Sequence, residues 1–137
     1  MSGETDLSKL LKNMQPARNP GEYIFCVVDS FEQAVALKPV CSFQEKEGTT
    51  AILRREQADA MSLSYSLVCA WITLTVHSSL EAVGLTAAVS RALAEEKISC
   101  NVVAAYYHDH LFVPVEDGER VMKVLAALIE ASRNEDR

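Results

Sequence analysis

The second half of the chain alternates regularly between apolar and polar positions. From residue 67 to residue 76 one face is apolar, formed by Ala70, Ile72, Leu74 and Val76. The intervening positions are Trp71, Thr73 and Thr75. A period of two predicts a strand with two different faces. An apolar stripe at helical spacing follows, formed by Leu85, Ala88, Val89, Ala92 and Leu93. It predicts an amphipathic helix.

Two further strands and a last helix complete this half. The runs "ISCNVVAAYY" (98–107) and "HLFVPV" (110–115) predict strands, and a second helical stripe is formed by Val121, Val124, Leu125, Leu128 and Ile129. The order strand–helix–strand–strand–helix within about 65 residues is typical of α+β units. One more strand would make a ferredoxin-like βαββαβ unit with an antiparallel sheet and helices on one face. We expect "EYIFCVV" (22–28) to supply it.

The first half predicts a smaller set of elements. Leu7, Leu10, Leu11 and Met14 predict a leading helix, with Thr5 or Asp6 as its N-cap. "NPG" (19–21) indicates a turn, residues 39–56 a hairpin around Gly48, and residues 55–61 a short helix. Because a strand of this half completes the sheet of the other, we expect two intertwined units. Residues 62–66 are the only plausible boundary, which predicts domains at 1–64 and 65–137.

Composition and charge narrow the function classes. The 137 residues are 49% hydrophobic, and 13 basic against 19 acidic residues give a net charge of -6. An acidic chain without a Lys/Arg cluster argues against nucleic acid as a partner. The start of the chain lacks a signal peptide pattern, and the longest apolar stretch is too short to span a bilayer. We expect a cytoplasmic protein with no membrane partner and four reduced thiols.

Catalytic signatures are missing from the sequence. It contains neither G-x-S-x-G nor a phosphate-binding glycine loop. Its paired carboxylates, Glu95-Glu96 and Glu116-Asp117, occupy solvated positions of helices. We therefore expect no enzyme activity, no catalytic residues and no cofactor.

The stretch "YYHDHLFVP" (106–114) allows two interpretations. His108 and His110 flank Asp109, which suggests a metal site if His77 joins them. Aspartate also suits a tight turn between strands, and a turn would keep the two histidines off a common face. We favour the hairpin tip and predict no metal.

At "SSLEAVGLTAAVSRALAEEKISCNVVAAYYHDHLFVPVED" (78–117) the sequence resembles the ACT domain, a small-molecule-sensing module of amino-acid metabolism. With "MQPARNPGEYIFCVV" (14–28) and "FQEKEGTTAILRRE" (43–56), the whole chain resembles small bacterial stand-alone proteins with two ACT-like halves. The second half is similar to the ACT units of aspartokinases and arginine sensors, and the first half is a diverged unit.

The segment 75–88, where a strand passes into a helix, is the best candidate site. Gly84 would let a ligand approach the backbone, and free N–H groups at a helix start can hold a carboxylate. The resemblance implies these ligand-binding residues: His77, Ser78, Ser79, Leu80, Val83, Gly84, Leu85, Asn101 and Val102. The alternative is that Gly84 serves only close helix–sheet packing, the serines only cap the helix, and Asn101 bonds to backbone or faces solvent.

These expectations combine into one function and two alternatives. The resemblance implies a non-catalytic regulatory protein that binds a small molecule, most plausibly an amino acid. We expect a homodimer with its ligand sites at or near the interface. The first alternative is a structural module that binds a partner protein without any effector, and the second is a metalloenzyme built on the three histidines.

Overall fold

The computed structural model describes residues 6–76 and 82–134, which fall into two compact units. The larger unit comprises residues 1–19 and 70–137, and the smaller unit comprises residues 20–69. Each is described separately below.

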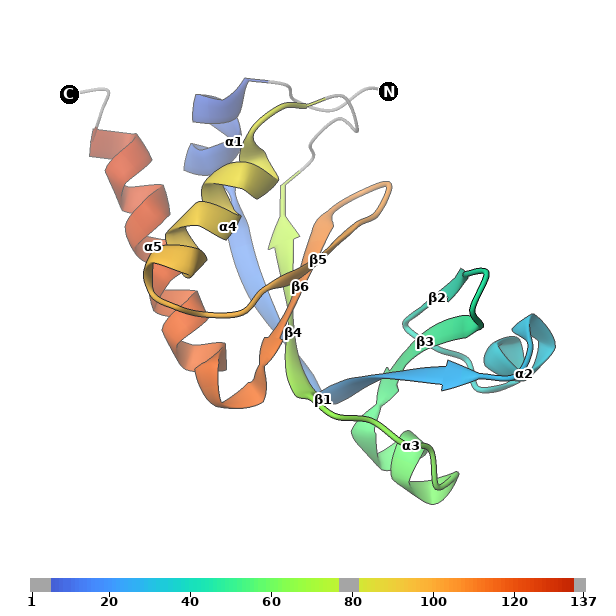
Figure 1. Ribbon diagram of the computed structural model, residues 1–137. Helices are drawn as coiled ribbons and strands as arrows, with labels where there is room; N and C mark the ends of the chain where they lie inside the picture. The colour runs from blue at the N-terminus through green and yellow to red at the C-terminus, as the bar shows by residue number, and fades with distance from the viewer. Residues whose placement is uncertain (1–5, 77–81, 135–137) are drawn as a thin grey trace. The chain divides into compact units, whose positions relative to one another are not determined.

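The larger unit is a four-stranded sheet with helices on one face (Figure 1). Its strand order is β1-β4-β6-β5. The strands are β1 (Gln15–Val28, first part), β4 (Val68–Thr75), β5 (Asn101–Ala104) and β6 (Asp109–Pro114). The helices are α1 (Leu7–Asn13), α4 (Leu85–Glu95), the 3-10 turn η1 (Val115–Asp117) and α5 (Gly118–Asn134).

Both predicted helical stripes face the core of this unit. Leu85, Val89 and Leu93 of α4 are buried, as are Val121, Leu125 and Ile129 of α5. They pack against the apolar face of β4 and β6, formed by Ala70, Ile72, Leu74, Leu111 and Val113. Leu10 and Met14 from the leading helix join the same cluster. The predicted strands and helices of the second half are confirmed.

The smaller unit repeats the pattern at reduced size. It contains the last part of β1, α2 (Phe31–Ala36), β2 (Cys41–Gln44), β3 (Thr49–Arg54) and α3 (Arg55–Ala60), with strand order β2-β3-β1. Both strand pairs are antiparallel, with Cys26 opposite Ala51 and Cys41 opposite Ile52. The predicted hairpin and short helix are confirmed, whereas α2 was not predicted. Ser30 caps α2 by accepting a hydrogen bond from the Gln33 N–H at 3.1 Å.

The fold is α+β and ferredoxin-like, as predicted, but β1 differs from its predicted length and role. The segment Tyr23–Val28 pairs with β3 in the smaller unit. The additional strand of the larger unit is the part of β1 that precedes this segment. The expected turn at 19–21 is wrong, because these residues continue β1. The Asn19 amide donates to Trp71 O and Thr73 Oγ1, and Gly21 bends the strand with a φ of 97°. The boundary at 64/65 stays a prediction.

Candidate functional site

Part of the predicted site surrounds the start of α4. His77, Ser78, Ser79 and Leu80 lie outside the described residues. Val83 is 80% exposed, whereas the next apolar residue, Leu85, is buried in the core. Gly84 is the N-cap of α4, with a left-handed φ of 100° and no side-chain hydrogen bond to the helix. The first helical bond is donated by Ala88 to the Gly84 carbonyl, so the N–H groups of residues 85–87 have no partner within the helix.

Gly84 also has a packing role. A Cβ at this position would lie 3.1 Å from Cδ2 of Leu7, which belongs to α1. The glycine therefore lets the leading helix approach α4 closely, so the close packing is between two helices and not, as the alternative had it, between helix and sheet. Beside this contact lies a groove of about 410 Å³, lined by Leu7, Gly84, Ala87, Ala88, Arg91, Ala92, Glu95 and Leu128.

The other two candidates lie at the opposite end of α4. Asn101 and Val102 open β5, six and seven residues beyond the last residue of the helix. Eleven helical residues span about 16 Å, so Asn101 and Gly84 do not meet within one chain. The Asn101 amide donates to Phe112 O at 3.3 Å, which matches the alternative that it bonds to backbone. Val102 is 37% exposed.

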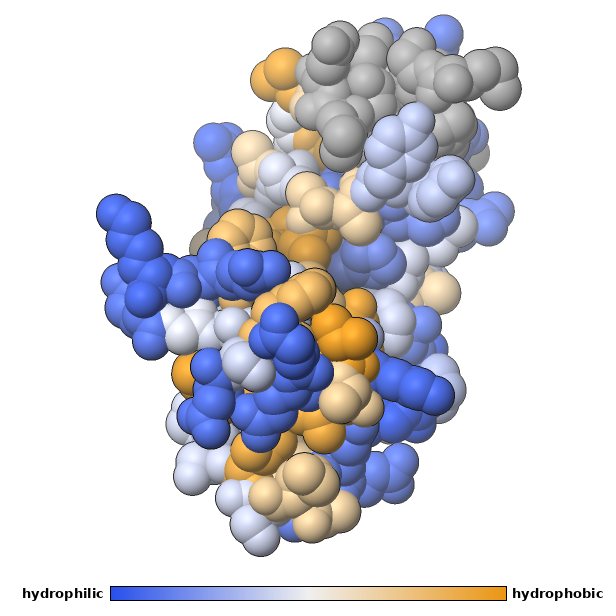
Figure 2. Space-filling model, turned by 90° about the vertical axis from the view of Figure 1, so that its right-hand side faces the viewer, coloured by the Kyte–Doolittle hydropathy of each residue, from blue (hydrophilic) through white to orange (hydrophobic). Residues whose placement is uncertain are grey.

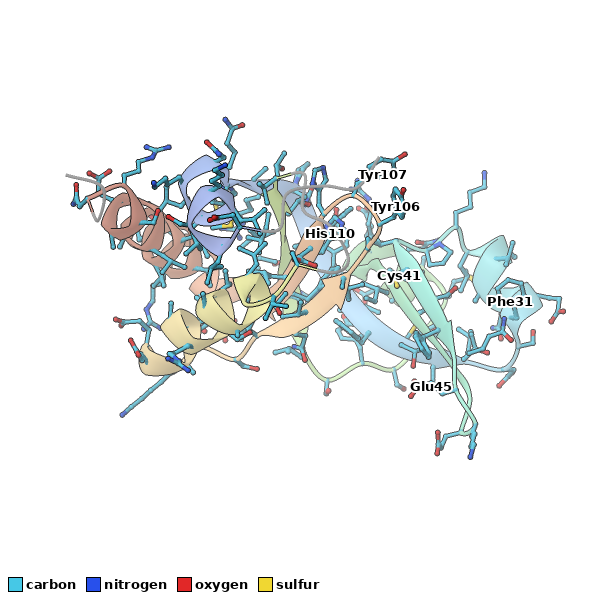
Figure 3. All side chains as sticks on the ribbon, turned by 90° about the horizontal axis from the view of Figure 1, so that it is seen from above. Phe31, Cys41, Glu45, Tyr106, Tyr107 and His110 are labelled. Carbon is cyan, nitrogen blue, oxygen red and sulfur yellow. The ribbon has the colours of Figure 1, made fainter. Side chains whose placement is uncertain are left out.

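The hairpin tip lies at the end of the sheet where β4 finishes. Ala105 N donates to His108 O at 3.1 Å, closing the turn between β5 and β6. His108 Nδ1 lies 3.2 Å from Val76 O, directly beyond β4. Tyr106 and Tyr107 are 62% and 68% exposed at the tip, with ring centroids 5.1 Å apart (Figure 3). Sequence reasoning treated these tyrosines only as strand residues. Their position beside the end of β4 follows from the order of β4 and β6 in the sheet, which no local sequence pattern indicates.

Asp109 and His110 belong to β6 and not to the turn, which corrects the prediction that a turn separates the two histidines. Trp71 Nε1 donates to His110 Nδ1 at 3.0 Å, and Thr73 Oγ1 lies 3.1 Å from the same nitrogen. Since the indole can only donate, Nδ1 is an acceptor and the imidazole is neutral. Burial, followed by the charge of His108, lowers the pKa of His110.

Trp71 also stacks on Phe112 with a centroid distance of 6.0 Å, so the histidine is part of an aromatic sheet face. Burial raises the pKa of the neighbouring Asp109 carboxyl. Over residues 6–76 and 82–134, no group of three or more His, Cys, Asp or Glu side chains is placed to hold a metal ion.

The four cysteines are unbridged. Cys26 and Cys69 are buried, and burial raises the pKa of the half-buried Cys100 thiol to about 11. In the part of the chain that the structure describes, none of the helices is both long and apolar enough to cross a membrane.

Comparison with known proteins identifies the family. Two ACT domain family models match, one over residues 2–70 and the other over residues 66–127. A Vibrio cholerae protein of unknown function, named a possible transport protein, is 44% identical over 90% of this chain and 95% of its own, with a TM-score of 0.82. An Agrobacterium tumefaciens protein is 17% identical over 85% of this chain and 89% of its own, with a TM-score of 0.67.

A ligand-free regulatory subunit of aspartate kinase from Thermus thermophilus shares the fold. It is 9% identical over 82% of this chain and 95% of its own, with a TM-score of 0.55. The comparison with curated proteins gives no match. The two family matches together span nearly the whole sequence, and the chain belongs to the ACT domain family, with two ACT domains in tandem.

Proposed function

We propose that this protein is a non-catalytic regulator that binds an amino acid through its C-terminal ACT domain. The family consists of regulatory modules, and the structural neighbours include a regulatory subunit of aspartate kinase. The observation that carries the proposal is the N-terminus of α4, where Gly84 caps the helix without a side-chain bond. The N–H groups of the first turn, which have no partner within the helix, and the positive end of the helix dipole suit an α-carboxylate.

The proposed ligand contacts fall into two groups. Gly84 and its neighbours, with His77, Ser78, Ser79, Leu80, Val83 and Leu85, would receive the carboxylate and surround the side chain. Asn101 and Val102 would receive the ammonium group and the opposite side of the ligand. Tyr106 and Tyr107 are exposed at the hairpin tip beside the end of β4 and would border the first group.

The separation of the two groups supports a homodimer. Gly84 and Asn101 lie at opposite ends of α4, about 16 Å apart along the helix. One small ligand can contact both only when the second group comes from another copy of the chain. We therefore propose that two copies form each site, and that ligand binding favours one packing of the pair.

Thermal unfolding in the presence of each of the twenty amino acids tests this proposal. A ligand at 100 times its Kd stabilises the folded state by about 2.7 kcal/mol, which raises the melting temperature measurably. Size-exclusion chromatography with light scattering would report a dimer. Asn101→Ala should weaken the response without unfolding the chain, because this side chain is exposed and makes one long hydrogen bond. An unchanged melting temperature with all twenty amino acids would reject the amino-acid function.

A protein-binding role is the second candidate, and exposed apolar residues of the smaller unit favour it. Large apolar side chains are exposed on its strands, helix and loop: Val27, Phe31, Val35, Val40 and Phe43. Figure 2 shows apolar patches between charged side chains on the face turned toward the viewer. Val27 and Phe43 are 67% and 68% exposed, and such patches often mark protein interaction sites.

A further inference from the structure

A cleft of about 380 Å³ lies in the smaller unit. It forms where β3 passes into α3, beside the first residues that β1 contributes to this unit. Its lining is charged, and consists of Gly21, Glu22, Arg54, Arg55, Glu56 and Asp59.

Arg55 forms one wall of the cleft and is held in place by two hydrogen-bond acceptors and one further carboxylate. Its Nη1 donates to Glu22 Oε1 at 3.1 Å, and its Nε donates to Tyr65 OH at 3.1 Å. The tyrosine hydroxyl donates in turn to Asp59 Oδ1 at 2.6 Å, and Arg55 Nε lies 3.8 Å from Asp59 Oδ2. Hydrogen bonds to Tyr65 and Glu22 raise the pKa of Arg55. These contacts pair the positive charge of Arg55 with the negative charges of Glu22 and Asp59 within the wall of the cleft.

Arg54 is positioned differently. Its guanidinium carbon lies 5.9 Å from the centroid of the Tyr23 ring, a cation–π geometry that fixes the head group without neutralising it. Gly21 passes alongside with a φ of 97°, and a Cβ on it would lie 3.5 Å from Arg54 Nη1. Within the described residues, neither Arg54 nor the exposed Glu56 forms an ion pair.

The lining charges that have no charged partner indicate which kind of ligand suits the cleft. Two arginines and three carboxylates line the cleft, so its net charge is negative and a simple anion is disfavoured. After the contacts of Arg55, one cation (Arg54) and one anion (Glu56) remain without a charged partner in the described part of the chain. A ligand that carries both charges within a few ångströms satisfies both residues.

We propose that this cleft binds a small zwitterion of the α-amino-acid class, with its carboxylate on Arg54 and its ammonium on Glu56. Guanidinium–carboxylate pairs are among the stronger hydrogen-bonded contacts in proteins. The volume of about 380 Å³ suits a ligand of this size. The site goes beyond the proposed function, because it uses none of the residues of the loop before α4 and does not depend on ligand binding there.

Residue-resolved NMR titration of the full chain tests the proposal. The probes are each of the twenty amino acids, with acetate, methylamine and inorganic phosphate as single-charge controls. The expected result is saturable shifts of the backbone amides of residues 21–22 and 54–59 with at least one amino acid. Binding at the loop before α4 would instead shift residues 82–88 and 101–102, so the two sites succeed or fail separately.

Charge-removing variants then assign the roles. Arg54→Gln and Glu56→Gln should each weaken binding at least about tenfold, because each removes a charged hydrogen-bond partner. Lys46→Gln and Glu47→Gln, on the β2–β3 turn, are matched controls and should bind as the unchanged chain does. Arg54→Lys keeps the charge and should retain part of the affinity. The thermal stability of every variant is measured first, so that a loss of fold is recognised.

Three results would overturn the proposal. The first is the absence of saturable shifts at residues 21–22 and 54–59 with all twenty amino acids. The second is binding of acetate or phosphate as tight as that of the best amino acid, which would show an anion site. The third is unchanged affinity in a folded Arg54→Gln or Glu56→Gln variant.

Discussion

Gly84→Ala separates the packing role of this glycine from its proposed ligand role. Two costs follow from the structure. An alanine at a φ of 100° lies in the left-handed region, which costs an L residue roughly 1–2 kcal/mol. The new Cβ would also lie 3.1 Å from Leu7 Cδ2, and overpacking of this kind costs about 1–3 kcal/mol. We expect the free energy of unfolding to fall by about 2–5 kcal/mol.

A double-mutant cycle with Leu7→Ala divides this loss. Removing the leucine side chain removes the contact but leaves the strained φ, so the two substitutions together should cost less than the sum of each alone. The coupling should be about 1 kcal/mol or more. Urea denaturation followed by fluorescence of Trp71, the only tryptophan and part of the larger unit, measures each value.

Gly118→Ala is the matched control. Gly118 has a helical φ of -54°, and the atoms that a Cβ would meet belong to the flexible end of the Arg18 side chain. We expect this variant to stay within about 1 kcal/mol of the unchanged chain. If Gly84→Ala costs less than about 1 kcal/mol, or if its effect adds independently to that of Leu7→Ala, the packing argument is wrong.

Three further predictions concern other parts of the chain. Lowering the pH from 7 to about 5.5 should destabilise the fold through His110. The pKa of His110 in the folded chain lies below the unfolded value of 6.5. The unfolded chain therefore takes up the proton first as the pH falls. Urea denaturation across this range should show a smaller pH slope for His110→Gln. Asp6→Ala should cost about 0.5–2 kcal/mol, since Asp6 caps α1 through Lys9 N; a calorimetric melt checks this. Cys100, with a pKa of about 11, should react slowly with iodoacetamide at pH 8 while the chain is folded and rapidly in urea. Mass spectrometry of the labelled peptide follows both reactions. Fast labelling of the folded chain would contradict this prediction.

The regular part of the fold could be predicted from the sequence because periodicity there reflects burial directly. The stripes of α4 and α5 face the core as their spacing indicates. The β1 strand could not be predicted at full length, because Pro16, Pro20 and Gly21 interrupt any strand pattern. The structure retains these residues in a strand since Asn19 bonds to Trp71 and Thr73 across the sheet. A contact between positions more than fifty residues apart leaves no local pattern.

The candidate site shows the same limit. Its helix start at Gly84 was found from a local pattern, the change from strand to helix period. The contact of Gly84 with Leu7 and the distance between Gly84 and Asn101 depend on how α1 and β5 pack around α4. The Arg54 cleft has no local signature, since adjacent arginines such as Arg54 and Arg55 also occur on solvated surfaces. Their different environments, a cation–π contact for Arg54 and ion pairs for Arg55, appear only in three dimensions.

The proposed division of the ligand site between two copies of the chain has a thermodynamic consequence. If one ligand contacts α4 of one copy and β5 of another, ligand binding and self-association must be linked. The ligand then tightens the dimer by the same factor by which the dimer raises the affinity for ligand. A regulatory module can pass on such a signal through its state of association, because each packing presents different surfaces. The exposed apolar residues of the smaller unit, Val27 and Phe43 among them, are surfaces that a change of association could cover or uncover. In this scheme amino-acid binding and protein binding are two steps of one regulatory function.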